Sequence, residues 1–250
     1  EADSYDRTFD ELIVDEAQDL LRPGWLDCLD LLLRGGLAAG RWRLFADLDG
    51  QDIYSQDEDA DGRALLAEAT GQALTTCDLR MNCRNTPAVA RLTQALGGLD
   101  PAYDDILRPD NGIVPQVQLY ADDDAQRTAL VDRLGKLERS GYRDRDIVVL
   151  STHGARNCVA RTVDEEPWCD RLQDYRRIED QDLSRDAIRY SSIQAFKGLE
   201  APVVILTDIE SVDDAKSRSL LYVGMTRAVE RLVILVHSDT REAVRRATGA

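Results

Sequence analysis

The 250-residue sequence lacks the patterns that mark membrane-spanning, secreted and zinc-binding proteins. No apolar run is long enough to cross a bilayer and no signal peptide is present, so we expect no membrane contact. The five cysteines include no C-x-x-C pair, and the sequence has only two histidines. An odd cysteine count also argues against a disulfide framework. These absences favour reduced, mostly packed thiols in a cytoplasmic protein.

Positive charge is also scarce. Lysine and arginine number 31 against 47 aspartates and glutamates, which gives a net charge of −16. Dedicated nucleic-acid-binding modules are usually basic. Any contact with a nucleic acid must therefore come from a local groove, and we expect nonspecific affinity to be modest and sensitive to salt.

A phosphate-binding loop of the form G-x-x-x-x-G-K-[ST] is absent as well. The only Gly-Lys pair, Gly135-Lys136, is followed by Leu137 inside a predicted amphipathic helix. In such a loop, backbone N–H groups cradle the phosphates and the lysine reaches them. These 250 residues therefore lack the segment that would hold the phosphates of a nucleoside triphosphate before any chemistry.

The most informative stretch is an apolar run, Leu12–Val14, that ends in two adjacent carboxylates, Asp15 and Glu16. The run predicts a parallel-sheet strand that is buried on both faces. Ligands of such sheets lie at the carboxyl ends of the strands. One carboxylate could hold Mg²⁺ there through water, and its neighbour could orient an attacking water. The alternative is an ordinary strand followed by a solvated acidic turn.

Further apolar runs alternate with amphipathic segments, which predicts α/β architecture with parallel sheets. Leu26, Leu29 and Leu33 are expected to share a buried helix face with Trp25. Residues 153–186 show little periodicity. The other expected strands are 42–46, 73–79, 116–120, 147–151, 189–193, 203–207 and 232–236. The expected helices are 23–33, 63–69, 87–96, 124–140, 217–229 and 240–247.

Five motifs, in this order, resemble those of the UvrD/Rep-like superfamily 1 helicases, whose core is a pair of RecA-like P-loop NTPase domains. The five segments are Leu12–Leu20 (LIVDEAQDL, motif II), Phe45–Tyr54 (FADLDGQDIY, III), Leu79–Pro87 (LRMNCRNTP, IV), Ser192–Glu200 (SIQAFKGLE, V) and Leu221–Ala228 (LYVGMTRA, VI). The resemblance implies the C-terminal part of RecA-like motor domain 1A at residues 1–79 and motor domain 2A at residues 80–250. Subdomain 2B would be reduced to a short connector around residues 153–186. The P-loop part of 1A is expected to belong to an N-terminal portion of the same protein.

The resemblance also implies that ATP and Mg²⁺ bind between the two motor domains of the intact protein. Asp15 would position Mg²⁺, and Glu16, beside the same ion, would activate water. Gln51 would sense the γ-phosphate. Arg84 and Arg227 would stabilise the transferred phosphoryl group, with Arg227 as an arginine finger. The alternative for each arginine is a surface ion pair.

Motif V has further implied roles. Glu200 would accept a hydrogen bond from a ribose hydroxyl, and Lys197 would meet a phosphate or a neighbouring acid. Gly198 would let the backbone approach the nucleotide closely. The alternative is a strand-to-helix turn in which Lys197 is a solvated charge.

Contacts with single-stranded DNA are implied for Tyr54, Ser192 and Gln194. The family usually places a tryptophan directly after this tyrosine, whereas Ser55 follows here. The family also commonly has T-x-H where this chain has Ser192-Ile193-Gln194. Both departures weaken the match at the DNA contacts.

Two functions follow from the resemblance. The first is the C-terminal part of an ATP-dependent DNA helicase or translocase that moves along single-stranded DNA. The alternative is a non-catalytic, degenerate helicase module that docks a nuclease or DNA-repair partner. The charged motif positions, which packing alone does not need, favour the enzyme.

Because the phosphate-binding loop is absent, we predict that this chain alone hydrolyses ATP no faster than background. Steady-state phosphate release in the presence of single-stranded DNA measures this rate. DNA-stimulated turnover that is lost in Glu16→Gln would contradict the prediction.

Overall fold

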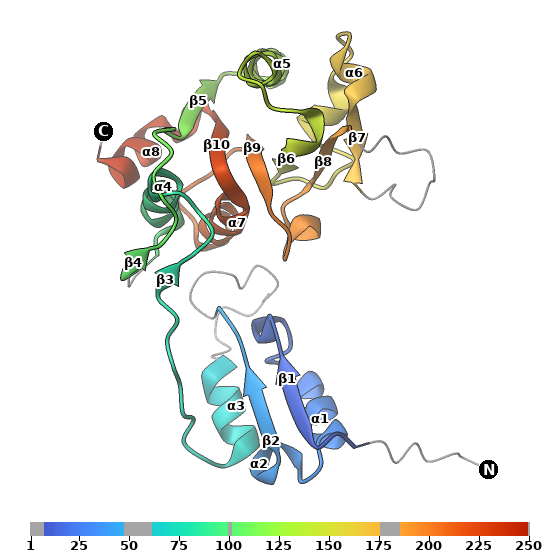
Figure 1. The fold of residues 1–250 in the computed structure, drawn as a ribbon, viewed down its shortest axis with the longest axis vertical. Helices are drawn as coiled ribbons and strands as arrows, with labels where there is room; N and C mark the ends of the chain where they lie inside the picture. The colour runs from blue at the N-terminus through green and yellow to red at the C-terminus, as the bar shows by residue number, and fades with distance from the viewer. Residues whose placement is uncertain (1–7, 48–61, 100–101, 176–185, 250) are drawn as a thin grey trace, which may run out of the picture. The chain divides into compact units, whose positions relative to one another are not determined.

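The computed structural model describes residues 8–47, 62–99, 102–175 and 186–249 (Figure 1). Contacts divide the chain into two compact units, unit 1 (Glu1–Leu79) and unit 2 (Arg80–Ala250). Each unit has an α/β structure, and its described strands pair in parallel. The predicted fold class is therefore confirmed. Among the residues so described, no helix is long and apolar enough to cross a membrane.

Unit 1 is a small layered structure. Its strands β1 (Glu11–Val14) and β2 (Arg41–Leu44) pair in parallel. Its helices are α1 (Pro23–Leu32), α2 (Gly36–Ala39) and α3 (Gly62–Thr70). Leucines of the helices and their connections pack against the strand residues Leu12, Val14, Trp42 and Leu44. These strand residues alternate with exposed ones, so one face of the sheet carries the core.

Three predictions for unit 1 are wrong. β1 is not buried on both faces, because Ile13 is 62% exposed on the face that no described helix covers. Trp25 lies outside the buried face of α1 and is exposed, whereas Leu26, Leu29 and Leu33 are buried. Residues 73–79 form no strand, because this largely exposed segment has no pairing partner in the described chain.

Unit 2 is built on a six-stranded, all-parallel sheet with the order β5-β10-β9-β6-β8-β7. Short strands β3 and β4 form a separate pair. The strands are β3 (Met81–Asn82), β4 (Asp105–Ile106), β5 (Gln116–Tyr120), β6 (Ile147–Ser151), β7 (Leu172–Asp174), β8 (Ile188–Ser192), β9 (Ala201–Ile209) and β10 (Ala228–His237). The helices are α4 (Pro87–Gly97), α5 (Asp123–Arg139), α6 (Trp168–Arg171), α7 (Ala215–Thr226) and α8 (Arg241–Thr248). Short 3-10 helices in the same unit are η2 (Asp144–Asp146), η3 (Val159–Thr162), η5 (Gln194–Phe196) and η6 (Ser238–Thr240).

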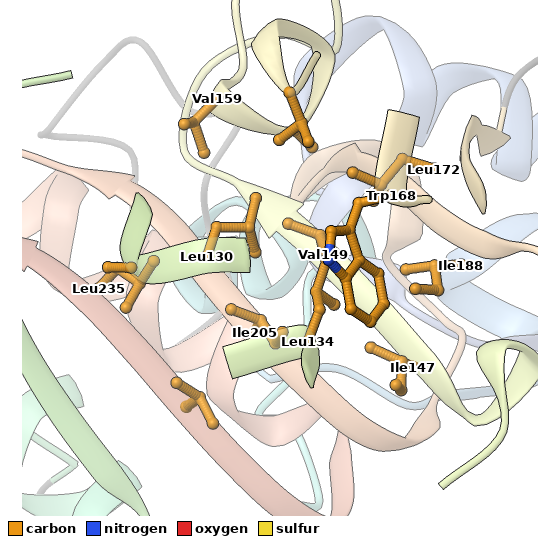
Figure 2. Close-up of a cluster of buried hydrophobic side chains, with 14 of the residues drawn as sticks. Leu130, Leu134, Ile147, Val149, Val159, Trp168, Leu172, Ile188, Ile205 and Leu235 are labelled. Atoms are coloured by element: carbon orange, nitrogen blue, oxygen red, sulfur yellow. The ribbon is translucent and has the colours of Figure 1, made fainter. Parts of the chain in front are cut away.

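The main core of unit 2 lies between the sheet and α5, η3 and α6. Leu130 and Leu134 of α5 contact alternate residues of the central strands, among them Val149 and Ile205. Trp168 of α6 closes this cluster beside Ile188 and Leu134 (Figure 2). The predicted inward positions Leu130, Leu134 and Leu137 of α5 are confirmed as buried. Helices α4 and α7 pack on the opposite face (Figure 1).

The connector around residues 153–186 contributes more to unit 2 than its weak periodicity predicts. Its described part forms η3, α6 and the edge strand β7, and it places Trp168 in the core. The predicted cysteine packing is wrong at three positions. All five thiols are free, but Cys28, Cys77 and Cys83 are exposed.

We predict that Leu134→Ala destabilises unit 2 by about 2–5 kcal/mol, because it removes a fully buried side chain from this close-packed cluster. Urea unfolding followed by circular dichroism measures the loss. Leu107→Ala is the matched control, because Leu107 is 55% exposed, and it should change stability by no more than about 0.5 kcal/mol. Equal losses in the two variants would contradict this assignment of the core.

The N-cap of α7 predicts a dependence of stability on pH. Asp214 accepts hydrogen bonds from the Ser211 hydroxyl at 2.7 Å and the Ser217 N–H at 2.8 Å. These bonds, the Ser211 one first, lower the pKa of Asp214 from 3.8 to about 2. A lowered carboxyl pKa stabilises the fold above the unfolded-state value, and this stabilisation is lost as the pH falls from 3.8 towards 2.

Asp214→Ala should therefore destabilise the protein by about 1 kcal/mol near neutral pH. The difference in stability between this variant and the unmodified protein should shrink progressively below about pH 4. Thermal unfolding across this pH range measures both effects. Asp213→Ala is the control, because Asp213 is a partly exposed partner of Arg246. A constant difference across the range would refute the capping role.

Candidate functional site

The two predicted carboxylates of unit 1 lie on the turn that follows β1. Asp15 is exposed and accepts a hydrogen bond from the N–H of Glu16 at 2.9 Å. Glu16 is half-buried and has a φ of 52°, a left-handed conformation that is uncommon outside glycine. Such a conformation is strained and must be held by its surroundings.

Gln18 supplies part of that support. This buried side chain donates from Nε2 to Glu16 Oε2 at 2.5 Å and accepts at Oε1 from the Asp47 N–H at 3.1 Å. The bonds fix the carboxylate turn of motif II beside the first part of motif III. The predicted residues Gln51 and Tyr54 lie outside the described residues.

The donor atoms of this turn suit magnesium. Mg²⁺ prefers oxygen ligands, keeps several waters, and is commonly held by one or two carboxylates together with substrate phosphates. Asp15 and Glu16 offer such oxygens. Among the described residues, no group of three or more His, Cys, Asp or Glu side chains is placed to hold a metal ion. Two adjacent carboxylates are compatible with an ion whose remaining ligands are water and phosphate oxygens.

Motif V forms the connection from β8 to β9 in unit 2. Ser192 is buried at the end of β8, and its hydroxyl oxygen accepts a following backbone N–H at 3.3 Å. Gln194 lies in η5, Lys197 follows it, and both are half-buried. Gly198 has a φ of +84°, and a Cβ there would meet nothing within 4 Å. Glycine is thus needed for the backbone conformation of the turn, and the turn leaves open space beside it.

Motif VI lies on α7, which packs closely against the sheet. A Cβ on Gly224 would lie 2.9 Å from Leu206 and 3.0 Å from Ile193, so glycine allows this approach. Arg227 is the C-cap residue of α7 and directly precedes β10. The packing of α7 therefore determines where the Arg227 main chain lies.

The Arg227 residue is buried in unit 2 and is only 1% exposed. Its Nε donates to the Val223 carbonyl at 3.0 Å, and its Nη2 donates to Thr226 Oγ1 at 3.0 Å. Its Nη1 donates to the Leu199 carbonyl of motif V at 3.4 Å. Because the residue is so deeply buried, a phosphate can reach its guanidinium only if the side chain or its surroundings move.

Arg84 and Glu200 form an ion pair beside Leu199, the motif V residue that Arg227 contacts. Arg84 Nε donates to Glu200 Oε2 at 2.9 Å, and the two side chains are 40% and 56% exposed. Glu200 directly precedes β9 and Arg227 directly precedes β10, and the first residues of these strands are register partners. Unit 2 thus brings together Arg84, Glu200 and Arg227, from motifs IV, V and VI.

Sequence reasoning missed three buried polar side chains of unit 2. Asn82 and Asn85 lie beside Arg84 and are buried. Asp208 is buried at the end of β9, where it accepts from Gln126 Nε2 at 3.0 Å. A carboxylate directly after an apolar run is the same signal that marked Asp15, so Asp208 could have been found. The asparagines carry no such signal.

No curated protein sequence matches the chain. Among solved structures, the C-terminal domain of a possible DNA helicase from Lactobacillus strain WCFS1 has 16% identity and a TM-score of 0.46, with 62% of this chain and 87% of that one covered. The arterivirus nonstructural protein 10 helicase in complex with DNA has 17% identity and a TM-score of 0.48. That match covers 99% of this chain but only 44% of the viral one.

At these identities and TM-scores the structural likeness carries no argument about function. The sequence match is more specific. Residues 187–235 match the UvrD-like helicase C-terminal domain family. This span contains β8, motif V, β9, α7 with motif VI, and most of β10. The predicted resemblance to UvrD-like helicases is therefore confirmed over residues 187–235, where the chain matches the C-terminal domain of that family.

Proposed function

We propose that this chain is the C-terminal part of an ATP-dependent DNA helicase or translocase that couples ATP hydrolysis to movement along single-stranded DNA. The observation that carries the proposal is the convergence of Arg84, Glu200 and Arg227 from three separate segments of unit 2. Guanidinium groups recognise phosphate oxygens, and a carboxylate accepts from a ribose hydroxyl. The cluster therefore supplies groups for both the ribose and the phosphates of a nucleoside triphosphate.

The Arg84–Glu200 pair fits an exchangeable contact. Both side chains are partly exposed, and an exposed ion pair contributes only about 0–1 kcal/mol. A nucleotide could therefore separate them at little cost, with Glu200 turning to the ribose and Arg84 to the phosphates. Lys197 and the open side of Gly198 lie on the same turn and would border the bound nucleotide.

Arg227 needs a larger rearrangement. Each hydrogen bond that its guanidinium leaves costs about 1 kcal/mol net, and charge-assisted bonds to a phosphoryl group are stronger than those to neutral oxygens. In the proposal, the main chain of Arg227 stays in place while its side chain turns to the phosphoryl oxygens.

Unit 1 would supply the other groups. Asp15 and Glu16 would hold Mg²⁺ through water, and Glu16 would accept a proton from the attacking water. Gln51 would contact the γ-phosphate. The bound ion would neutralise charge on the phosphate oxygens.

The P-loop portion of the protein is proposed to complete the sheet of unit 1. All-parallel sheets are normally covered on both faces, yet Ile13 of β1 is exposed, and in the described residues each strand pairs on one side only. Additional strands would extend the sheet of unit 1, and their phosphate-binding loop would hold the nucleotide.

Single-stranded DNA is the proposed track, with Tyr54, Ser192 and Gln194 as contacts. Ser192 is buried, so it would act mainly through the main chain at the end of β8. The net charge of −16 opposes nonspecific binding, and the contact should weaken as salt increases.

A non-catalytic module that docks a nuclease or DNA-repair protein is the second candidate. The observation in its favour is that Arg227 and Arg84 are already bonded within unit 2. Under this hypothesis the charged motif residues hold the fold together and bind no nucleotide.

The two candidates differ in whether the complete protein hydrolyses ATP and in what Arg227→Ala does to that activity. We predict that DNA-stimulated turnover falls by roughly a thousandfold, because an arginine finger acts on charge that develops in the transition state. Nucleotide affinity should remain largely intact. Arg227→Lys should also fail, because an ammonium does not reproduce the planar guanidinium fork.

Turnover, nucleotide affinity and thermal stability should be measured on the same variants. Arg246→Ala is the matched control, because it removes an exposed arginine of unit 2 that pairs with Asp213. If Arg227→Ala lowers only stability, with turnover per folded molecule unchanged, the arginine-finger role is wrong. If the unmodified protein shows no DNA-stimulated turnover, the non-catalytic module is favoured.

A further inference from the structure

Two asparagines that the proposed function does not use lie between the two arginines. Asn85 is only 1% exposed and Asn82 is also buried. Asn82 Oδ1 accepts from the N–H groups of Arg84 at 3.1 Å and of Asn85 at 2.9 Å. The Asn82 side chain therefore closes the turn that carries Arg84.

The same pair reaches motif VI. Asn82 Nδ2 donates to Asn85 Oδ1 at 2.9 Å, which leaves the amide nitrogen of Asn85 facing away from Asn82. Asn85 Nδ2 donates to the Thr226 carbonyl at 3.1 Å and to the Ala228 carbonyl at 2.6 Å. These carbonyls belong to the residues directly before and after Arg227.

Each atom of the Asn85 amide thus has a defined partner. Its two N–H groups hold the main chain on both sides of Arg227, and its oxygen is held by Asn82. The carbonyl of Arg227 itself accepts from the N–H of Ala201, the first residue of β9. The main chain of Arg227 is therefore fixed from motif IV and from the first residue of β9, independently of its side chain.

We propose that Asn85, oriented by Asn82, is a positioning residue that sets Arg227 and Arg84 at a fixed spacing for one nucleotide. The purpose of this spacing rests on the proposed function, whereas the positioning itself does not. Because its main chain is fixed, the Arg227 side chain can exchange its carbonyl acceptors for a phosphate while its position relative to the phosphoryl group stays defined. A side chain misplaced by about 1 Å can cost about a hundredfold in rate.

Asn85→Asp is the sharpest variant, because it keeps the shape of the side chain and its acceptor for Asn82. It replaces the donor that faces two carbonyls with a carboxylate oxygen, which repels them. Asn85→Ser is the second variant, because its hydroxyl is small and can donate only one hydrogen bond. Thr93→Val is the matched control, since Thr93 is buried in α4 and bonds only its own helix, at the Val89 carbonyl.

The first experiment is amide hydrogen exchange on the 250-residue chain without nucleotide. We expect the amides of Ala201 and Arg227 to exchange about tenfold faster or more in Asn85→Asp, because two hydrogen bonds that hold this region are lost. Thr93→Val should leave both amides at the rate of the unmodified chain. Unchanged exchange at Ala201 and Arg227 in folded Asn85→Asp overturns the proposal. If Asn85→Asp does not fold, Asn85→Ser is judged by the same criterion.

The second experiment measures ATP turnover in the complete protein. Asn85→Asp should lower kcat by about a hundredfold and leave nucleotide affinity within about threefold. In an Arg227→Ala background it should lower kcat no further, because it acts through Arg227. A full additional loss in that background overturns the proposal. If the unmodified protein shows no turnover, the proposed function fails, and hydrogen exchange alone decides whether Asn85 positions Arg227.

Discussion

Burial of the Arg227 guanidinium is the constraint on which the site of unit 2 depends. A buried charged group is costly unless its hydrogen bonds are made. Its acceptors come from the last turn of α7 and from the motif V turn. The helix must therefore approach the sheet closely, which explains Gly224, and the motif V turn must return to β9 beside it. One buried side chain thus ties the geometry of motifs V and VI together.

A second buried charge organises the opposite ends of the strands. Asp208 lies in β9 with a φ of 60°, close to a register shift between β9 and β10. Its carboxylate accepts from the Ser151 hydroxyl at 2.5 Å, the Thr207 hydroxyl at 2.9 Å and the Gln126 amide at 3.0 Å. Burial of the Tyr120 phenol raises the pKa of that group, and the nearby charge of Asp208 raises it further. Because the sheet interior is apolar on both faces, both buried charges lie at strand ends, where polar partners are available.

The sequence predicted best what depends on local apolar patterns. The predicted bounds of β5 and β6 agree with the structure, and the buried leucines of α5 are the expected ones, because strand and helix periodicities are read within a few residues. The exposed face of β1 and the missing strand at residues 73–79 were misjudged, because apolar content does not show whether a partner strand is present. The core position of Trp168 was missed because the connector has little periodicity.

The candidate site shows the same difference between local and long-range information. The short sequence motifs predicted that Arg84, Glu200 and Arg227 belong to one site, and the structure places them together. Asn85 was missed because its bonds join residues 141 and 143 positions away, a relation that no local pattern contains. The details that decide how an arginine is aimed are therefore long-range, even where its identity is evident from a short motif.

The energetics of Arg227 bear on which proposed function is correct. If the residue served packing alone, an apolar side chain such as methionine would fill the space without desolvating a charge, and such replacements are often neutral or stabilising. Three acceptors of the guanidinium are neutral oxygens, those of the Val223 and Leu199 carbonyls and the Thr226 hydroxyl. Hydrogen bonds from a guanidinium to a phosphate are stronger than bonds to neutral oxygens. Under the proposed ATP-dependent function, a bound nucleotide would therefore return more of the desolvation cost of this buried charge than these oxygens do.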